Sequence, residues 1–286
     1  MDLGRIGIWS WSYGGDDGEV AEVAAELEEL GYGALWFPNR PAIFDLSRTI
    51  LGATRRTVAA TGITNIWTHS PEAAAAQHRA ITDAHPGRFL LGLGVSHPHL
   101  VDRDQPGRYR QPLARMREYL DELDRQPAPV PVGERALAAL GPRMLELSRD
   151  RTAGAHPYLV TPEHTRRARA LLGPGKLLAP EQAVVLESEP SRARTLAREH
   201  LHLYLRAPNY TNNWLRLGFT SDDLADGGSD RLVDGLVAWG SIDAVQDRIA
   251  EHHEAGADHV CLQVASGSRS ALPREQWRQL AALVAV

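Results

Sequence analysis

A histidine that follows a run of small residues is the first candidate for chemistry. The run GLGVSH at 92–97 is similar to a dinucleotide-binding fingerprint, but its sixth residue is His97 and no helix begins directly after it. The dinucleotide-binding interpretation therefore fails. Small residues at the end of a strand let a planar ring approach the backbone closely. The imidazole that follows has an ordinary pKa of about 6.5, so His97 is a candidate proton donor or acceptor.

The turn formed by Gly141, Pro142 and Arg143 is the second candidate. It ends a β-type run of small residues and opens a helix, which leaves free backbone N–H groups and a positive helix end beside Arg143. That arrangement can hold a phosphate. A tight turn that binds nothing would have the same sequence, so both interpretations stay open. The run TPEH at 161–164, with Thr161 and His164, repeats the arrangement more weakly because its glutamate competes with an anion.

Metal chemistry is not favoured by the histidines or by the cysteine. Among the twelve histidines, His69, His97 and His99 fall at expected strand ends, but no His-Glu-x-x-His motif or carboxylate at ligand spacing accompanies them. The single cysteine, Cys261, excludes an internal disulfide and lies in an apolar run typical of an inert core thiol. We therefore expect no metal site.

Aromatic residues at the same strand ends offer a second kind of contact. Trp11 follows the first predicted strand and Trp67 ends the third, so both could line a pocket for an aromatic ring, although core packing explains tryptophans as well. Together with His69 and His99, they are the candidates for contact with a substrate.

The elements that must position these residues alternate along the whole chain. Short β-type runs are followed by amphipathic helical stretches, the pattern of a parallel sheet with crossover helices. N-cap residues stand before first-turn prolines, as at Ser70 and Thr161. The eight predicted strands cover residues 5–10, 34–38, 62–67, 88–95, 135–140, 155–160, 182–187 and 259–264. Eight such repeats favour a closed (β/α)8 TIM barrel over an open doubly wound sheet.

Two segments exceed ordinary loop length. Residues 96–111 follow the fourth predicted strand, and residues 206–236 lie after the seventh. Barrel enzymes build their active sites at the carboxyl ends of the strands, so we expect both segments to form lids or substrate walls there.

Composition narrows the class of partner. The net charge of the 286 residues is −5 and both signs are interspersed, so nucleic acid is not an expected partner. No stretch of about 18 apolar residues exists, and the run at 5–10 is too short for a signal-peptide core, so we expect no membrane association and a cytoplasmic location. No linker-like segment divides the chain, which predicts one domain over residues 1–286.

Several runs together resemble the luciferase-like monooxygenase superfamily. They are GITNIWTHSP at 62–71, PGRFLLGLG at 86–94, AALGP at 138–142 and the stretch 240–258, in that order. The runs AALGPRML at 138–145 and TPEH at 161–164 are similar to its actinobacterial, F420-dependent branch. The resemblance implies a homodimeric luciferase-like TIM barrel that holds the tricyclic ring of a flavin or deazaflavin at its carboxyl face, with the coenzyme phosphate near Gly141.

The resemblance and the strand ends together assign a set of residues to the coenzyme. They are Asn39, Gly62, Ile63, Thr64, Asn65, Gly94, Val95, Ser96, Ala139, Leu140, Gly141, Arg143, Thr161 and His164. The resemblance also implies a non-proline cis peptide between Gly62 and Ile63, behind the ring.

Two departures from the family pattern matter. Many relatives have an acidic residue where this sequence has Asn39 and Arg40, and sugar-phosphate-oxidising relatives have glutamate where it has His97. The substrate of those relatives therefore cannot be carried over.

The expected function is hydride transfer between F420 and a small organic substrate, with His97 exchanging the proton. The nearest alternative is an FMN-dependent luciferase-like monooxygenase. A deazaflavin has carbon in place of the flavin N5 and activates oxygen poorly, so the cofactor decides between the two. The other alternative is a barrel that has lost catalysis and serves as a binding protein, an idea that Asn39 and Arg40 keep open.

Overall fold

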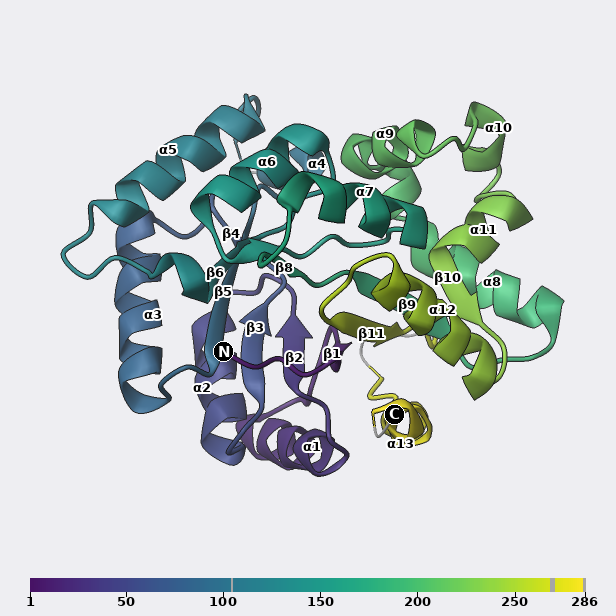
Figure 1. Ribbon diagram of the computed structural model, residues 1–286, viewed down its shortest axis with the longest axis horizontal. Helices are drawn as coiled ribbons and strands as arrows, with labels where there is room; N and C mark the ends of the chain where they lie inside the picture. The colour runs from purple at the N-terminus through teal and green to yellow at the C-terminus, as the bar shows by residue number, and fades with distance from the viewer. Residues whose placement is uncertain (104, 268–270, 285–286) are drawn as a thin grey trace.

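A barrel of parallel strands forms the centre of the molecule in the computed structural model, which describes residues 1–103, 105–267 and 271–284 (Figure 1). We call its eight positions staves, two of which are each made of two short strands. In chain order they are β1 (Ile6–Trp9), β2 (Ala34–Phe37), β3 (Val58–Thr61) with β4 (Thr64–Asn65), β5 (Phe89–Gly94), β6 (Arg135–Leu137), β7 (Gly154–Ala155), β8 (Leu177–Leu178) with β9 (Glu181–Val185), and β11 (Val260–Val264). Every pairing between neighbouring staves is parallel.

The seventh stave closes the barrel. β8 pairs with β7, while β9 pairs with β11, which in turn pairs with β1. Between the two strands, Ala179 N donates to Ala155 O and Cys261 N donates to Pro180 O, both at 2.9 Å. Pro180 has no N–H of its own, so the ladder changes partner at this point. The predicted (β/α)8 barrel is confirmed, and each predicted strand corresponds to one stave.

The third stave contains a β-bulge. Ala60 is paired with Leu90 and Thr64 with Leu93, so this stave has one residue more than its neighbour over the same stretch. No peptide bond among the described residues is cis, and the predicted cis bond between Gly62 and Ile63 is wrong.

The bulge explains both that error and a misplaced strand. The chain accommodates the extra residue by interrupting the ladder between β3 and β4, with Gly62 N donating to Phe37 O at 2.7 Å. A trans bond also avoids the roughly 2.5–4 kcal/mol cost of a non-proline cis bond. The stave covers 58–65, whereas the prediction was 62–67, because Ala59 and Ala60 lack the β-branched side chains that mark a strand.

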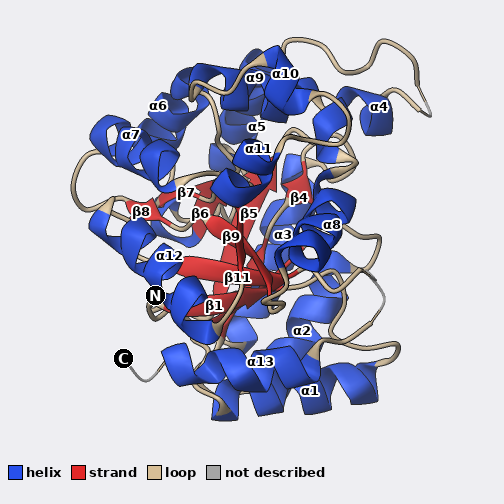
Figure 2. Cartoon of the chain, turned by 90° about the vertical axis from the view of Figure 1, so that its right-hand side faces the viewer, coloured by secondary structure: helices blue, strands red, loops and turns tan. Residues whose placement is uncertain are grey.

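Helices surround the barrel on its outside (Figure 2). They include α1 (Asp17–Glu29), α2 (Ile43–Ala53), α3 (Pro71–Ala84), α5 (Pro112–Asp124), α6 (Pro142–Arg151), α7 (Pro162–Leu172), α8 (Pro190–Leu201), α12 (Ile242–Glu254) and α13 (Arg274–Leu280). The predicted N-caps are confirmed at Ser70 and Thr161, whose side chains accept from Ala73 N and His164 N. None of the helices in the described residues has the length and apolarity needed to span a bilayer.

The two long segments are mostly helical and lie at the same end of the barrel. Residues 96–111, of which residue 104 is outside the described part, contain α4 (Pro98–Val101). Residues 206–236 contain α9 (Pro208–Arg216), α10 (Ser221–Leu224) and α11 (Asp230–Leu236), and they lead into β10 (Val237–Trp239). Both views show α4 and α9 above the strands (Figures 1 and 2). β10, which the sequence did not predict, pairs with β9 on the outside of the barrel.

Candidate active site

A cavity of about 820 Å³ opens at the carboxyl ends of the staves. Its lower wall consists of residues at or just after the ends of the strands. Its upper wall comes from the two long segments, which contribute among others His97, Tyr109, Asn209 and Arg216. The expectation that both segments wall the site is therefore confirmed, because parallel staves bring their carboxyl ends to one place.

Most of the residues assigned to the site from sequence line this cavity. They are Trp11, Asn39, Gly62, Ile63, Asn65, Gly94, Val95, Ser96, His97, Ala139, Leu140, Gly141 and Arg143. One detail differs from the expectation. The small residues at the end of β5 do not leave open backbone, because a β-carbon at Gly94 would lie 2.6 Å from Ile63 Cδ1. The Ile63 side chain already covers that surface.

Three other predicted residues lie just behind the wall and hold it in place. Thr64 is buried and donates to Thr61 Oγ1 at 3.1 Å. Trp67 donates its indole N–H to Val95 O at 2.8 Å, and so fixes the chain just before His97. His164 is buried on α7 with Nε2 2.9 Å from Leu140 O, which supports the strand end before Gly141.

The remaining three predicted residues are also outside the wall. Thr161 caps α7. His69 packs edge-on against Phe44, with ring centroids 5.5 Å apart. His99 is exposed and stacks on the outer side of the site against His97, at 5.7 Å between centroids. The positions of His69, His99 and Trp67 therefore do not place them against a ligand in this cavity.

At the rim, His97 is half-buried and is held by a residue from the other long segment. Its Nδ1 lies 3.0 Å from Oδ1 of Asn209 on α9. An amide oxygen only accepts, so with this amide orientation Nδ1 carries the proton and Nε2 keeps its lone pair. Desolvation by burial lowers the pKa of His97, the Asn209 hydrogen bond raises it and the nearby His99 lowers it, with a net decrease. His97 is therefore a neutral imidazole at pH 7.

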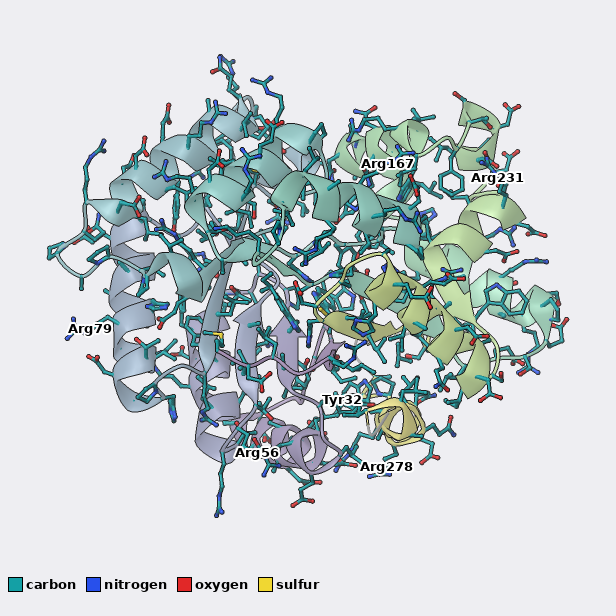
Figure 3. The ribbon with its side chains drawn as sticks, in the orientation of Figure 1. Tyr32, Arg56, Arg79, Arg167, Arg231 and Arg278 are labelled. Atoms are coloured by element: carbon teal, nitrogen blue, oxygen red, sulfur yellow. The ribbon has the colours of Figure 1, made fainter. Side chains whose placement is uncertain are left out.

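Also at the rim, the Gly141 turn is flanked by two guanidinium groups. Arg143 lies in the first turn of α6, and Arg216 ends α9, with its Nη2 3.6 Å from where a β-carbon of Gly141 would be. Arg167 of α7, labelled in Figure 3, fixes this end of α9 by donating to Arg216 O at 2.9 Å. Within the described residues, neither exposed guanidinium of Arg143 and Arg216 has a hydrogen bond or ion pair. The turn therefore has two free cations beside a helix N-terminus.

The floor of the cavity is aromatic and buried. His156, directly after β7, stacks on Trp36 with ring centroids 4.2 Å apart and an interplanar angle of 21°. Its Nδ1 lies 2.7 Å from Ala179 O, and desolvation by burial lowers its pKa to about 4. Trp9 packs against Trp11 and Tyr158, at 5.1 and 5.2 Å between centroids.

A buried polar network supports this floor from beneath. The Tyr158 hydroxyl lies 2.8 Å from the Tyr204 hydroxyl and 2.6 Å from the Gln263 amide. Glu181 accepts from Leu159 N at 2.9 Å, and desolvation raises the pKa of its carboxyl to about 8. Glu181 is therefore mainly protonated at pH 7, and His156 is neutral, so the floor carries little charge.

Comparison with known proteins agrees with the sequence resemblance. The family model described as Luciferase-like monooxygenase matches residues 3–126. A Mycobacterium tuberculosis protein, named provisionally as a coenzyme F420-dependent oxidoreductase, is 25% identical to this chain. The alignment is 301 residues long with its gaps and covers 81% of this chain and 84% of the relative. Over residues 3–126 the chain is therefore similar to the luciferase-like monooxygenases.

Solved structures extend the likeness to the whole fold. The F420-dependent tetrahydromethanopterin reductase from Methanopyrus kandleri aligns with a TM-score of 0.73 at 15% identity, covering 98% of this chain and 97% of that one. An F420-dependent secondary alcohol dehydrogenase aligns at 0.71 and 13%, covering 99% and 98%. The FMN complex of 3,6-diketocamphane monooxygenase from Pseudomonas putida aligns at 0.71 and 14%, covering 99% and 97%.

Sequence reasoning missed several residues that the fold brings to the cavity. Arg216 and Asn209 come from α9, far along the chain from their partners at Gly141 and His97. Sequence reasoning also passed over His156, although its position in the predicted strand 155–160 was a usable signal. Among the described residues, no group of three or more His, Cys, Asp or Glu side chains is placed to hold a metal ion.

Proposed function

We propose that this protein is an oxidoreductase that binds coenzyme F420 in the cavity and exchanges hydride between the coenzyme and a small organic substrate. The observation that carries the proposal is the presence, in one cavity, of a helix N-terminus flanked by two guanidinium groups and of a neutral imidazole, all at the rim. The name of the Mycobacterium tuberculosis relative and the names of two aligned structures support F420 as the coenzyme.

The residues of the cavity fit a large phosphorylated coenzyme. A volume of about 820 Å³ lies within the roughly 300–1,000 Å³ usual for ligand pockets. The N-terminus of α6 offers free backbone N–H groups, and Arg143 and Arg216 supply the unpaired positive charges that a phosphate needs. The aromatic side chains of the floor offer ring contacts to a planar ring system.

His97 is the residue we assign to proton exchange. A bound deazaflavin supplies the hydride-accepting or hydride-donating ring. Asn209 holds His97 Nδ1–H, so the unprotonated Nε2 is free to accept a proton when the substrate is oxidised and to return it in the opposite direction. Trp11, in the lower wall of the same cavity, is the predicted substrate residue that retains this assignment.

The experiment that tests this proposal is a side-by-side binding titration with F420 and FMN. We expect F420 to bind more tightly under the same conditions. Tighter binding of FMN would contradict the assignment of the coenzyme, and binding of neither would contradict the assignment of the cavity.

An FMN-dependent monooxygenase is the second candidate, because 3,6-diketocamphane monooxygenase in its FMN complex has the same fold over 99% of this chain. The two candidates differ in their reaction with oxygen. Oxygen consumption measured with each reduced cofactor distinguishes them: the proposal predicts none above background with reduced F420, and turnover-linked consumption with reduced FMN would favour the monooxygenase.

A further inference from the structure

Two nitrogen atoms in the floor of the cavity have no hydrogen-bond partner. Trp9 Nε1 and His156 Nε2 belong to residues that line the cavity and are each only 2% exposed, and neither atom makes a hydrogen bond within the described residues. Buried polar groups in native proteins are nearly always paired, so such a pair calls for a partner that the chain itself does not provide.

The two atoms have complementary roles. An indole N–H can only donate. His156 Nδ1 faces the carbonyl oxygen of Ala179 at 2.7 Å and must donate to it, so Nε2 of the neutral ring can only accept. Stacking on Trp36 fixes the plane of the imidazole. The floor therefore presents one fixed donor and one fixed acceptor.

Gly62 lies directly beside both atoms. A β-carbon at this position would stand 2.8 Å from Trp9 Nε1 and 3.0 Å from His156 Nε2, so only a glycine fits against both nitrogens without displacing them. Any side chain there would cover them. The bulge between β3 and β4 places this glycine on the cavity wall.

We propose that Trp9 and His156 together bind the lactam edge of a planar heterocycle, the ring N–H donating to His156 Nε2 and the adjacent carbonyl oxygen accepting from Trp9 Nε1. This inference rests on the proposed function, because the pyrimidinedione ring of both flavins and deazaflavins has such an edge at N3. It adds an orientation: the pyrimidinedione end lies at the floor, and the phosphate lies toward Gly141 at the rim. The aromatic rings of Trp11 and Tyr158 beside Trp9 favour a planar ligand over an aliphatic hydroxyl.

Methylation of the ligand tests this directly. F420 and FMN are each titrated in parallel with their N3-methyl derivatives, and binding is followed by ligand fluorescence. For the coenzyme that binds, we expect the methyl derivative to bind roughly 5- to 100-fold more weakly to the unaltered protein, because it leaves His156 Nε2 unpaired. His156→Ala removes the acceptor and leaves room for the methyl group, so the two affinities should become equal within about twofold.

Trp9→Phe and Trp11→Phe form a matched pair of variants. Both remove one indole, but the Trp11 N–H lies 2.9 Å from the Gln263 amide oxygen once that amide is oriented to accept. We expect Trp9→Phe to weaken binding of both the parent and the methyl compound while preserving their ratio, and to weaken it more than Trp11→Phe does.

Equal binding of the parent and the N3-methyl compound by the unaltered protein would overturn the inference and leave the proposed function standing. If the affinity ratio of the parent to the N3-methyl compound were unchanged in His156→Ala, N3 would face another group. This result would also overturn the inference and leave the proposed function standing. Failure of both F420 and FMN to bind the unaltered protein would overturn the inference together with the proposed function.

Discussion

The rim and the floor of the cavity are built in opposite ways. At the rim, His97, Arg143 and Arg216 lie on the long segments or at a helix start, partly in solvent, and both arginines are charged and unpaired. At the floor, Trp9 and His156 lie on or directly after staves, buried and close-packed, with little charge around them. The barrel thus separates a rigid, neutral surface from a polar, more accessible one.

Two histidines show what this difference means for chemistry. Burial lowers the pKa of both, but His156, a buried residue that faces a backbone carbonyl, has a pKa of about 4 and stays neutral through the physiological range. His97 is half-buried, and its partner is the Asn209 side chain. The same residue type is therefore suited to recognition at the floor and to proton exchange at the rim.

The largest effect is expected at the rim. His97→Ala should lower turnover by about 10² to 10⁴, the usual contribution of a positioned acid or base, while coenzyme affinity changes by only a few fold. His97→Gln should be nearly as impaired because an amide does not exchange a proton at neutral pH. Steady-state kinetics and titrations on the same samples measure both quantities. His202→Ala, an exposed histidine at the end of α8, is the control, and near-normal turnover in both His97 variants would remove the proposed role.

The next effect concerns charge at the rim. Arg143→Ala should weaken coenzyme binding by about 1.5 to 3 kcal/mol, the scale of a charge-assisted hydrogen bond, and the loss should shrink at high salt because Arg143 is exposed. Arg79→Ala is the matched control: this exposed arginine on α3 pairs with Asp83 and lies away from the cavity residues (Figure 3). If Arg143→Ala bound the coenzyme with unchanged affinity, the Gly141 turn would be a tight turn that binds nothing.

A third test addresses the rigidity of the floor. Gly62→Ala should destabilise the protein by about 1–3 kcal/mol, because its β-carbon would press on two buried rings that cannot move aside. Gly52→Ala is the matched substitution in α2, where nothing lies within 4 Å, and it should stabilise by about 0.5–1 kcal/mol. Urea unfolding compares the two. Equal free energies of unfolding for the two variants would show that the rings of the floor can move to accommodate a β-carbon at Gly62.

The last effect is on stability as a function of pH. Desolvation lowers the pKa of five buried histidines from 6.5, to about 3 for His252 and to about 4 for the other four, which are His78, His156, His164 and His259. The unfolded chain therefore binds more protons between these values, and the free energy of unfolding should fall as the pH drops from 6.5 toward 4.

Glu181 acts in the opposite direction over part of this range. Its pKa rises from 4.5 to about 8 on folding, so its contribution is present below pH 4.5 and is lost as the pH rises toward 8. The Glu181 carboxyl offsets only part of the loss in the free energy of unfolding that the five histidines cause. The urea midpoint should be lower at pH 5 than at pH 7, and Glu181→Gln should steepen this fall. A midpoint that does not change between the two pH values would show that the histidines are not buried in neutral form.

Local sequence features predicted the eight staves and many strand-end residues of the cavity. Runs such as 5–10 and 88–95 mark strands by composition, and Ser70 and Thr161 mark helix starts by their capping side chains. The prediction failed where composition is ambiguous. The alanine-rich start of β3 was missed, and β10 is only three residues long and follows a helix directly.

The sequence by itself determined which side chains stand at the strand ends, because that placement depends on the short-range period of strands and helices and on the shared edge of parallel staves. Only the tertiary structure decided what those side chains do. Asn209 holds His97 across 112 residues of chain, and Arg216 reaches Gly141 from another helix. Protonation, pairing and the free donor and acceptor of Trp9 and His156 depend on burial, and burial results from contacts between distant segments that no local pattern contains.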